Sequence, residues 1–284
     1  MSHLGHSKKE YKTFSTISIN KKSANASWLK LPSLNTLPHP YILIDKATKP
    51  FLPFIIYETT PFDNSSGNSQ ILQNLIMTLI SLSKNQQEIK TKKQLQGGIM
   101  KVIGLCSGSD SGKYAGVYSR KPGLTPNKIG TDNNQWTKLH QYDEFVYSRI
   151  SHFLKLAANE NQSLMEEAKL PNFSQLEWTS ANPKEELKSF TNVIVTQDVF
   201  FNKPHQDLND LNAWTYGIFS FVSKKKFHPI PTVFTPSGHG LHFPKLIMEI
   251  NFSKNLASWE FFGIHQQWFI IQQNLLHKLS IMTK

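Results

Sequence analysis

Apolar residues recur every three or four positions in two stretches of the chain, a spacing that places them along one face of an α-helix. The first stretch contains Ile71, Leu72, Leu75, Ile76, Leu79 and Leu82, and the second contains Tyr142, Phe145, Val146, Ile150, Phe153, Leu154 and Ala157. Pro171 ends the helical region that follows the second stretch. The pattern therefore predicts two long amphipathic helices that pack against a sheet.

Short runs of β-branched and aromatic residues, separated by loops with Pro and Gly, indicate strands elsewhere. These runs occupy residues 41–45, 51–57, 99–106, 193–195, 214–222 and 246–252. Pro50 and Pro53 indicate that the first two runs form a hairpin at a sheet edge, because proline cannot donate a ladder hydrogen bond. Since the β-rich sequence mostly follows the helices, we expect an α+β protein with a jelly-roll core and two or more flanking helices.

The domain organisation follows from the same pattern. Residues 1–38 carry serine, asparagine and lysine without a sustained apolar period, so we expect a poorly ordered polar arm. Residues 39–284 show no internal repeat and no sharp boundary, and we expect a single domain. No leader sequence and no run of about 20 apolar residues is visible, so the expected location is intracellular, without a membrane span.

Composition narrows the function classes. The sole cysteine, Cys106, excludes an intramolecular disulfide and a zinc site built from several cysteines. The formal net charge of +11 favours a polyanionic partner such as DNA or RNA. Arg120 and Arg149 are the only arginines, so contact with the phosphate backbone is expected rather than base readout. The lysines are spread along the chain, however, which is also typical of an ordinary solvated surface.

One short motif has the spacing of a metal site. In His205-Gln206-Asp207 an extended backbone places the imidazole and the carboxylate on the same side, where both can bind one cation. With a second histidine from a distant strand they would form a facial triad, which suits Fe(II) and leaves adjacent positions open. His-x-Asp also arises often by chance, and an ordinary ion pair explains it equally well.

The sequence around this motif resembles a known family. Residues 192–196 (NVIVT), 200–207 (FFNKPHQD) and 214–219 (WTYGIF) are similar to the Tet-like 2-oxoglutarate and Fe(II)-dependent dioxygenases of fungi. The resemblance extends to residues 116–120, to the helix around Tyr147 and Arg149, and to residues 243–244 and 250–252, and it covers roughly residues 40 to 270.

The resemblance implies a fold, an activity and a set of site residues. The fold would be a double-stranded β-helix, with His205 and Asp207 as iron ligands and Asn202 as a cofactor-binding residue shortly before them. The cofactors would be Fe(II) and 2-oxoglutarate, and the reaction would oxidise a methyl group, with 5-methylcytosine or a related base in nucleic acid as the substrate. A nuclear location follows only from that substrate.

Two histidines are candidates for the third iron ligand. His277 and His265 lie 72 and 60 residues beyond His205, which leaves room for the strands between them, whereas His242 lies too near. We favour His277, because the hydroxyl residue Ser280 follows it as in the family. Either histidine is explained as well by an ordinary role in a core or on the surface.

The anchor of 2-oxoglutarate departs from the family pattern. Arginine usually binds the distal carboxylate from a strand beyond the second histidine, and no arginine follows Arg149 here. Lys278 or an upstream arginine such as Arg149 would have to replace it, although Arg149 and Arg120 also fit ordinary surface positions. After His277 the chain is expected to stop before another strand forms. The alternative is therefore a C-terminally shortened, inactive jelly-roll remnant that binds nucleic acid or a protein.

Overall fold

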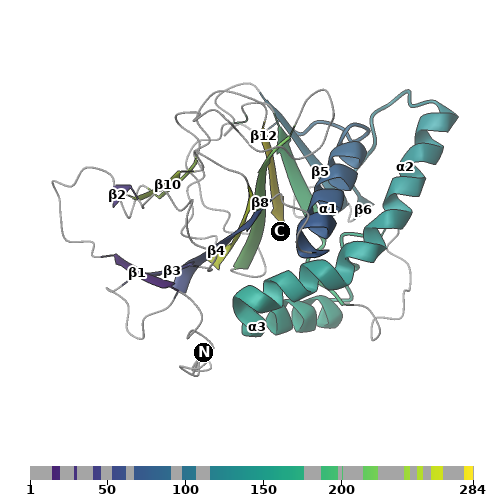
Figure 1. Ribbon diagram of the computed structural model, residues 1–284. Coiled ribbons are helices and arrows are strands. Elements are labelled where there is room, and N and C mark those ends of the chain that lie inside the picture. Colours follow the sequence, from purple (N-terminus) through teal and green to yellow (C-terminus); the bar gives the residue numbers. More distant parts are fainter. Residues whose placement is uncertain are drawn as a thin grey trace.

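The computed structural model of the chain describes residues 15–19, 29–30, 41–45, 53–61, 67–90, 98–106, 116–175, 187–197, 200, 214–222, 240–243, 248–251, 257–264 and 278–283. Helices cover one side of a large sheet, and a small second sheet lies toward its other side (Figure 1). The described residues thus form an α+β structure whose central layer is the large sheet.

The large sheet has nine strands. Their order is β1 (Ser15–Ile19), β3 (Tyr41–Asp45), β4 (Pro53–Pro61), β11 (Ala257–Ile264), β8 (Trp214–Phe221), β12 (Lys278–Thr283), β7 (Asn192–Gln197), β5 (Ile99–Cys106) and β6 (Gly116–Val117). All neighbours pair antiparallel except β1 and β3, which are parallel. The small sheet has the order β2 (Leu29–Lys30), β10 (Met248–Asn251) and β9 (Gly240–Phe243).

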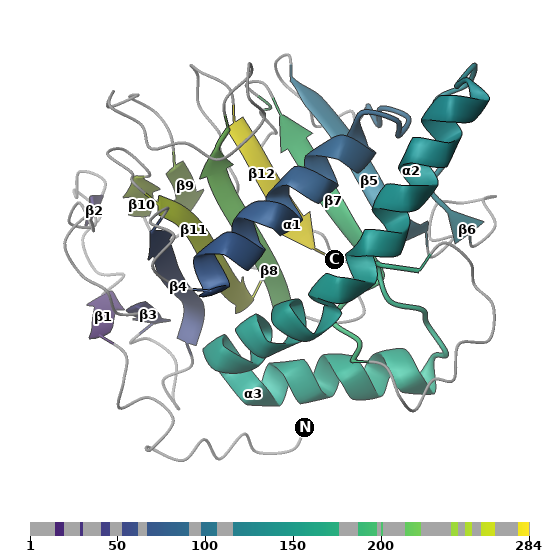
Figure 2. The ribbon, with the colours of Figure 1, turned by 45° about the vertical axis from the view of Figure 1, so that its right-hand side comes forward.

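Three α-helices follow one another across one face of the large sheet (Figure 2). They are α1 (Gly67–Ser83), α2 (Pro126–Leu139) and α3 (Asp143–Glu167), with a short 3-10 turn, η1 (His140–Tyr142), between the last two. Thr125 caps α2 by accepting a hydrogen bond from the Lys128 amide, and Pro126 occupies the first turn, where a missing N–H costs nothing.

The helix α3 is bent back on itself at Leu154. The φ of −159° and ψ of 96° at this residue are not helical. The Tyr147 hydroxyl donates to Asn159 Oδ1 at 3.1 Å across the bend, although residues 12 positions apart in a straight helix would be separated by about 18 Å. The two halves of α3 therefore form a helical hairpin under the sheet.

The hydrophobic core lies between these helices and one face of the large sheet, called here the helix face. Pairing registers place Ile56, Val193, Val195, Tyr216 and Ile218 on this face, and all five belong to the core cluster. They pack with helix residues such as Leu72, Leu75, Leu79, Trp136 and Phe153. Burying such a continuous apolar layer is what holds helices and sheet together.

Most of the predicted elements are confirmed. The hairpin of β3 and β4, the helix α1, the strand β5, and the strands β7, β8 and β10 lie at the residues that the sequence predicts. The expected edge position of the hairpin is wrong, because β1 pairs with β3 and β11 pairs with β4. The helix α2 was missed, and the second predicted helix starts at Asp143 after η1. Within residues 1–38, where the sequence predicts a poorly ordered arm, β1 pairs with β3 and β2 pairs with β10. The division at residue 38 stays a prediction.

Gly104 occupies a position in β5 that excludes a side chain. Its φ is +107°, and a Cβ there would lie 2.4 Å from the Thr191 carbonyl oxygen and 2.8 Å from Asn192 Cα. We expect Gly104→Ala to lower the free energy of unfolding by at least about 2 kcal/mol, measured by urea denaturation, because the strained φ and the backbone clash add. Gly130→Ala in α2 is the matched control: its Cβ meets nothing within 4 Å, and it should stabilise by up to about 1 kcal/mol.

The turn between α2 and α3 contains a carboxyl group with a shifted pKa. Burial raises the pKa of Asp143 from 3.8 to about 6, although the Ser174 hydroxyl donates to its Oδ2 at 2.8 Å and His140 Nδ1 lies 3.3 Å from the same atom. Its other oxygen, Oδ1, is buried without a hydrogen-bond partner. Since the folded protein holds this proton more tightly than the unfolded chain, stability is lost as the pH rises from about 4 through about 6.

Asp143→Asn should therefore stabilise the protein at pH 8 by about 1–3 kcal/mol, because the amide removes the cost of the buried charge. The gain should vanish at about pH 3, below both pKa values, where the wild-type carboxyl is protonated in both states. Urea unfolding at the two pH values measures the difference. Glu144→Gln, which alters the neighbouring exposed carboxylate, should show no such pH dependence; an equal gain at both pH values for Asp143→Asn would contradict the assignment.

Candidate functional site

The predicted metal ligands lie outside the described residues. This applies to His205, Asp207, His265 and His277, and also to Asn202. Within the part of the chain that the structure describes, no three His, Cys, Asp or Glu side chains come together in a way that could hold a metal ion. What the structure contributes is the framework on either side of the motif: β7, which ends at Gln197, the buried Phe200, and β8, which begins at Trp214.

The strand β12 changes one expectation from the sequence. We expected the chain to stop after His277 before another strand forms, and this is wrong: Lys278–Thr283 forms β12, inserted between β7 and β8. Ladder hydrogen bonds on both edges fix this position, with Leu279 paired to Ser220 of β8 and to Gln197 of β7. A strand of six residues at the end of this sequence is thus part of the middle of the sheet.

The two candidates for the third ligand adjoin opposite ends of β8. Ile264, which precedes His265, pairs with Trp214, whereas Lys278, which follows His277, pairs with Phe221. Trp214 and Phe221 are separated by about 23 Å along the strand, given a rise of about 3.3 Å per residue. One iron cannot bind both histidines unless the chain between them returns along the sheet, so the choice between them is a choice between two ends of the sheet.

The face of the large sheet that is turned away from the helices, called here the inner face, is also buried. Thr196 and Ser280 pair across β7 and β12, and Phe219 pairs with Ser280 from β8, so these positions share the inner face with Thr215. Thr196, Thr215 and Phe219 are at most 6% exposed although no described helix covers them. The central sheet therefore has an interior on both sides, and the inner one contains polar groups.

Asn192 places an unsatisfied acceptor on that inner face. Its register partner is Gly104, and its Nδ2 donates to the Leu105 carbonyl at 3.1 Å and to Thr191 Oγ1 at 3.3 Å. These two bonds fix the orientation of the amide, and its Oδ1 is left buried with no hydrogen-bond partner. Buried acceptors are normally satisfied, so a donor from a bound water or ligand is the natural partner.

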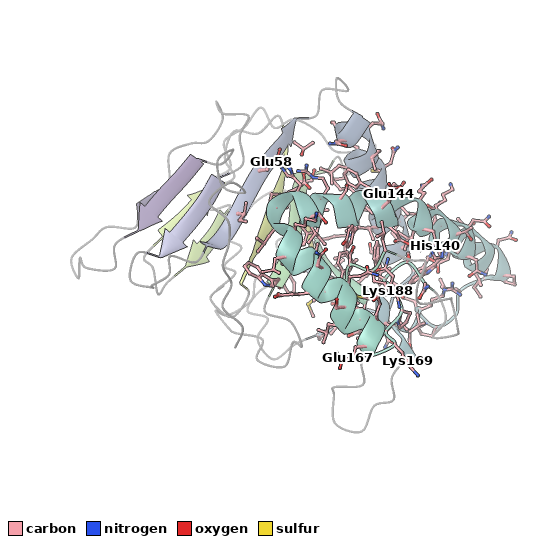
Figure 3. The ribbon with its side chains drawn as sticks, turned by 90° about the horizontal axis from the view of Figure 1, so that it is seen from below. Glu58, His140, Glu144, Glu167, Lys169 and Lys188 are labelled. Carbon is pink, nitrogen blue, oxygen red and sulfur yellow. The ribbon has the colours of Figure 1, made fainter. Side chains whose placement is uncertain are left out.

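Arg149 lies at the centre of a buried ion network on the helix face. Its Nε donates to Glu260 Oε2 at 2.9 Å, and its NH2 group donates to Glu260 Oε1 at 2.8 Å and to Glu58 Oε2 at 2.7 Å. Thr60 Oγ1 and the Tyr216 hydroxyl donate to Glu260 as well, at 2.7 and 2.5 Å. Glu260 is fully buried, so the network joins α3 to β4, β11 and β8. Figure 3 labels one member of the network, Glu58 of β4, beside α3.

The groups of this network shift one another's pKa values. Burial alone would lower the pKa of Arg149, but the charge of Glu260 and its hydrogen bonds raise it above the ordinary value. Burial would raise the pKa of Glu58, but the hydrogen bond from His152 and the charge of Arg149 outweigh it, and the pKa lies below its usual range. Burial and the Glu260 carboxylate raise the pKa of Tyr216, which keeps its proton. Arg149 and Glu58 are therefore charged at neutral pH.

The buried position of Arg149 tests the expectation that this residue lies on the surface. An exposed surface position for Arg149 is wrong, since the residue is 8% exposed. Its assignment to 2-oxoglutarate stays a prediction, and its described partners are two carboxylates of the sheet. Arg120 binds a single buried carboxylate, with its Nε 2.6 Å from Asp132 Oδ2, and Asn85 donates to the other oxygen of that carboxylate at 3.0 Å.

Comparison with known proteins identifies the family. Residues 65–261 match the family model described as the Tet-like 2OG-Fe(II) oxygenase superfamily, which spans more than half of the chain. The chain belongs to the Tet-like 2OG-Fe(II) oxygenase superfamily, as the resemblance around His205-Gln206-Asp207 predicts. The matched range contains this motif and the strands β5, β7 and β8 on both sides of it.

Other comparisons add little. No curated protein matches the sequence significantly. A solved structure described as "The structure of OsALKBH1" aligns with 82% of this chain and 97% of its own, at 9% identity and a TM-score of 0.34. A likeness at this TM-score is too low to carry an argument about fold or substrate. Among the described helices, none combines the length and the apolar character needed to cross a membrane.

Proposed function

We propose that the protein is an Fe(II)- and 2-oxoglutarate-dependent dioxygenase that oxidises a methylated base in nucleic acid. The observation that carries this proposal is the family match over residues 65–261, which contains a histidine and a carboxylate two residues apart. An imidazole and a carboxylate suit Fe(II), because mixed nitrogen and oxygen donors with open neighbouring positions are typical of non-haem iron oxygenases.

The strand order supports a double-stranded β-helix as the setting of this site. Four neighbours of the large sheet, β7, β12, β8 and β11, alternate early and late segments of the C-terminal half, as expected when a chain rolls up. The paired strands β9 and β10, which come from the segment between β8 and β11, belong to a separate sheet. The buried inner face of the large sheet then becomes the lining of the roll.

The inner face offers polar groups that would suit bound cofactors. The inner face contains buried hydroxyl groups and the unsatisfied Oδ1 of Asn192, which an apolar core would not contain. We propose His205, Asp207 and either His277 or His265 as iron ligands, with Asn202 close to them. Lys278 is the candidate for the distal carboxylate of 2-oxoglutarate, because β12 starts there, between Gln197 of β7 and Phe221 of β8.

The chemistry follows from what these groups supply. Iron with bound 2-oxoglutarate supplies the oxidant for a C–H bond of a methyl group, and the protein residues bind, orient and shield the reactants. A methylated base would have to leave the duplex stack, or come from a single strand, to reach an interior site. The net charge of +11 supports a nucleic-acid substrate, because neutralised phosphates release counterions.

The test is an anaerobic titration of the purified protein with Fe(II) and 2-oxoglutarate, following the metal-to-ligand charge-transfer band that forms when the oxoacid chelates iron. We expect a band in the wild type and succinate formation when oxygen and a 5-methylcytosine-containing DNA are added. A folded wild-type protein without the band would contradict the proposal and favour the inactive jelly-roll remnant that binds nucleic acid or a protein. A band without DNA oxidation would leave the oxygenase and refute this substrate.

A further inference from the structure

Basic residues gather at one edge of the described structure, beside the end of α1. Residues 84–90, 101 and 120–132 contain six basic side chains, Lys84, Lys90, Lys101, Arg120, Lys121 and Lys128, and two acidic ones, Glu88 and Asp132. We call the six basic residues the basic edge patch. By contrast, residues 133–175, which include the second half of α2 and all of α3, contain four basic and five acidic residues. The positive charge of the described chain is therefore concentrated at this edge.

Backbone contacts bring these residues together from four segments. The segment after α1 forms isolated bridges with two other segments, Gln86 with Arg120 and Glu88 with Lys101 of β5. The Lys121 amide donates to the Asn85 carbonyl at 2.8 Å. Asp132 of α2 accepts from both Asn85 and Arg120, and Lys128 lies four residues earlier, on the same side of that helix. The exposed lysines of the patch, Lys84, Lys90, Lys121 and Lys128, are thus held on a fixed framework around the buried Lys101.

Two positive charges of the patch, those of Lys101 and Lys121, lie close together. Lys101 is only 6% exposed, and the Lys121 ammonium lies close enough to act on it. Burial and this neighbouring charge lower the pKa of Lys101 to about 8. Glu88, which is bridged to Lys101, offsets part of this repulsion, and the ion pair of Arg120 with Asp132 neutralises a buried carboxylate. A polyanion would relieve the repulsion between the lysines and release its own counterions.

The patch lies near the end of the sheet where the proposed site begins. Lys101 pairs with Val195 of β7, two residues before that strand ends at Gln197, and Gln197 pairs with Leu279 of β12. Strands β5 and β12 are separated by β7 alone, so their axes are about 10 Å apart. Lys101 occupies a helix-face position, as Val195 does, so a phosphate backbone that runs from the patch to the start of β12 has to pass over the ends of these strands.

From these observations we infer that the basic edge patch binds the sugar-phosphate backbone that flanks the base delivered to the proposed oxygenase site. The inference rests on the proposed function for the nature of the ligand, while the location comes from the arrangement of the lysines. It assigns the patch to phosphate groups and not to base edges, since a single arginine, already bound to Asp132, is present in it. Binding should therefore depend strongly on salt and weakly on sequence.

The experiment compares two triple variants that lose the same charge. Lys90→Gln/Lys121→Gln/Lys128→Gln neutralises exposed residues of the patch, and Lys138→Gln/Lys155→Gln/Lys169→Gln neutralises exposed residues around α3. Fluorescence anisotropy of a labelled DNA duplex and of its single strand, each with one 5-methylcytosine, gives the affinity at several salt concentrations. We expect the patch variant to bind about 100-fold more weakly at 0.1 M salt, with a log–log salt slope shallower by about 2–3. The control variant should match the wild type.

The outcomes separate this inference from the proposed function. Equal weakening by both variants, or no DNA binding by the wild type at low salt, overturns the patch even if the charge-transfer band forms. Equal competition by poly-glutamate of matched charge overturns nucleic acid in favour of an acidic protein. Asp207→Ala should bind DNA as the wild type does while it loses the band, and loss of its DNA affinity would overturn a separate backbone site.

Discussion

Replacing Arg149 by methionine should lower the free energy of unfolding by about 3–5 kcal/mol, the largest stability loss that we expect from one substitution in the described chain. The variant removes three charge-assisted hydrogen bonds and leaves Glu260, which is 0% exposed, without its counter-charge. The hydroxyls of Thr60 and Tyr216 would still donate to that carboxylate, but they cannot neutralise it. Urea denaturation at pH 7 measures the loss.

Two further variants make this test specific. In Arg149→Met/Glu260→Gln the buried charge is gone together with its partner, so the double variant should recover part of the stability, which a simple packing defect would not do. Arg120→Met is the comparison at the other arginine: Asp132 keeps the amide of Asn85, and the Arg120 side chain is 28% exposed, so the loss should be smaller. A loss for Arg149→Met below about 1 kcal/mol, with no recovery in the double variant, would show that the network does not hold α3 to the sheet.

The parts of the fold that the sequence predicts are those with a strong local pattern. The helix α1 buries a wide apolar stripe, and β5 and β8 are continuous runs of strand-forming residues. The helix α2 buries only Asp132, Trp136 and Leu139, so it lacks the wide stripe on which the prediction relied. The Thr125-Pro126 pair, a cap followed by proline in the first turn, was the available signal for its start.

Two strands were missed for reasons that are not local. The strand β11 has Glu260 in the middle of its aromatic run, which makes the sequence look interrupted. Its partner Arg149 is 111 residues away, and only the folded structure shows that the charge is neutralised inside the core. The strand β12 follows His277 directly and gains its stability from β7 and β8 on either side. A strand of this kind is defined by its neighbours more than by its own residues.

In the candidate site, too, the sequence predicts the local part and not the part that depends on distant residues. The pair His205 and Asp207 could be proposed from the sequence because a histidine and a carboxylate two residues apart form a local motif, and the family match contains this motif. The proposed third ligand and the proposed anchor for the oxoacid belong to the distant C-terminal segment, where no spacing rule selects one histidine. The position of β12 restores one element that the sequence seemed to lack, a last strand that starts at a basic residue, Lys278.

The network and the site are connected through shared strands. Glu260 accepts hydrogen bonds on the helix face from β4, β8 and α3. The same strand β8 places Thr215 and Phe219 on the inner face, which lines the proposed site. Because side chains alternate between faces, a strand can be held by ionic contacts on one side and present ligand-binding groups on the other. We therefore expect the Arg149 network to act on stability and not on the chemistry itself.

Alanine at Asp207 should abolish the charge-transfer band of Fe(II) with 2-oxoglutarate and reduce methyl oxidation by at least about 1000-fold, because the carboxylate is one of the three proposed protein ligands to the iron. His205→Ala should behave in the same way, with urea denaturation showing a folded protein in both cases. His228→Ala, a histidine outside the proposed ligand set, is the matched control and should keep the band. Retained turnover in both Asp207→Ala and His205→Ala would refute the assignment of the site.

The same measurement selects the third ligand. His277→Ala and His265→Ala should differ sharply, because the residues next to them pair with opposite ends of β8. Loss of the band in His277→Ala alone would place the iron toward the Phe221 end, where Lys278 can reach the oxoacid. In that case Lys278→Ala should weaken 2-oxoglutarate binding, seen as a higher half-saturation concentration with Fe(II) binding unchanged. Loss in His265→Ala alone would place the iron toward Trp214 and require another group to bind the distal carboxylate.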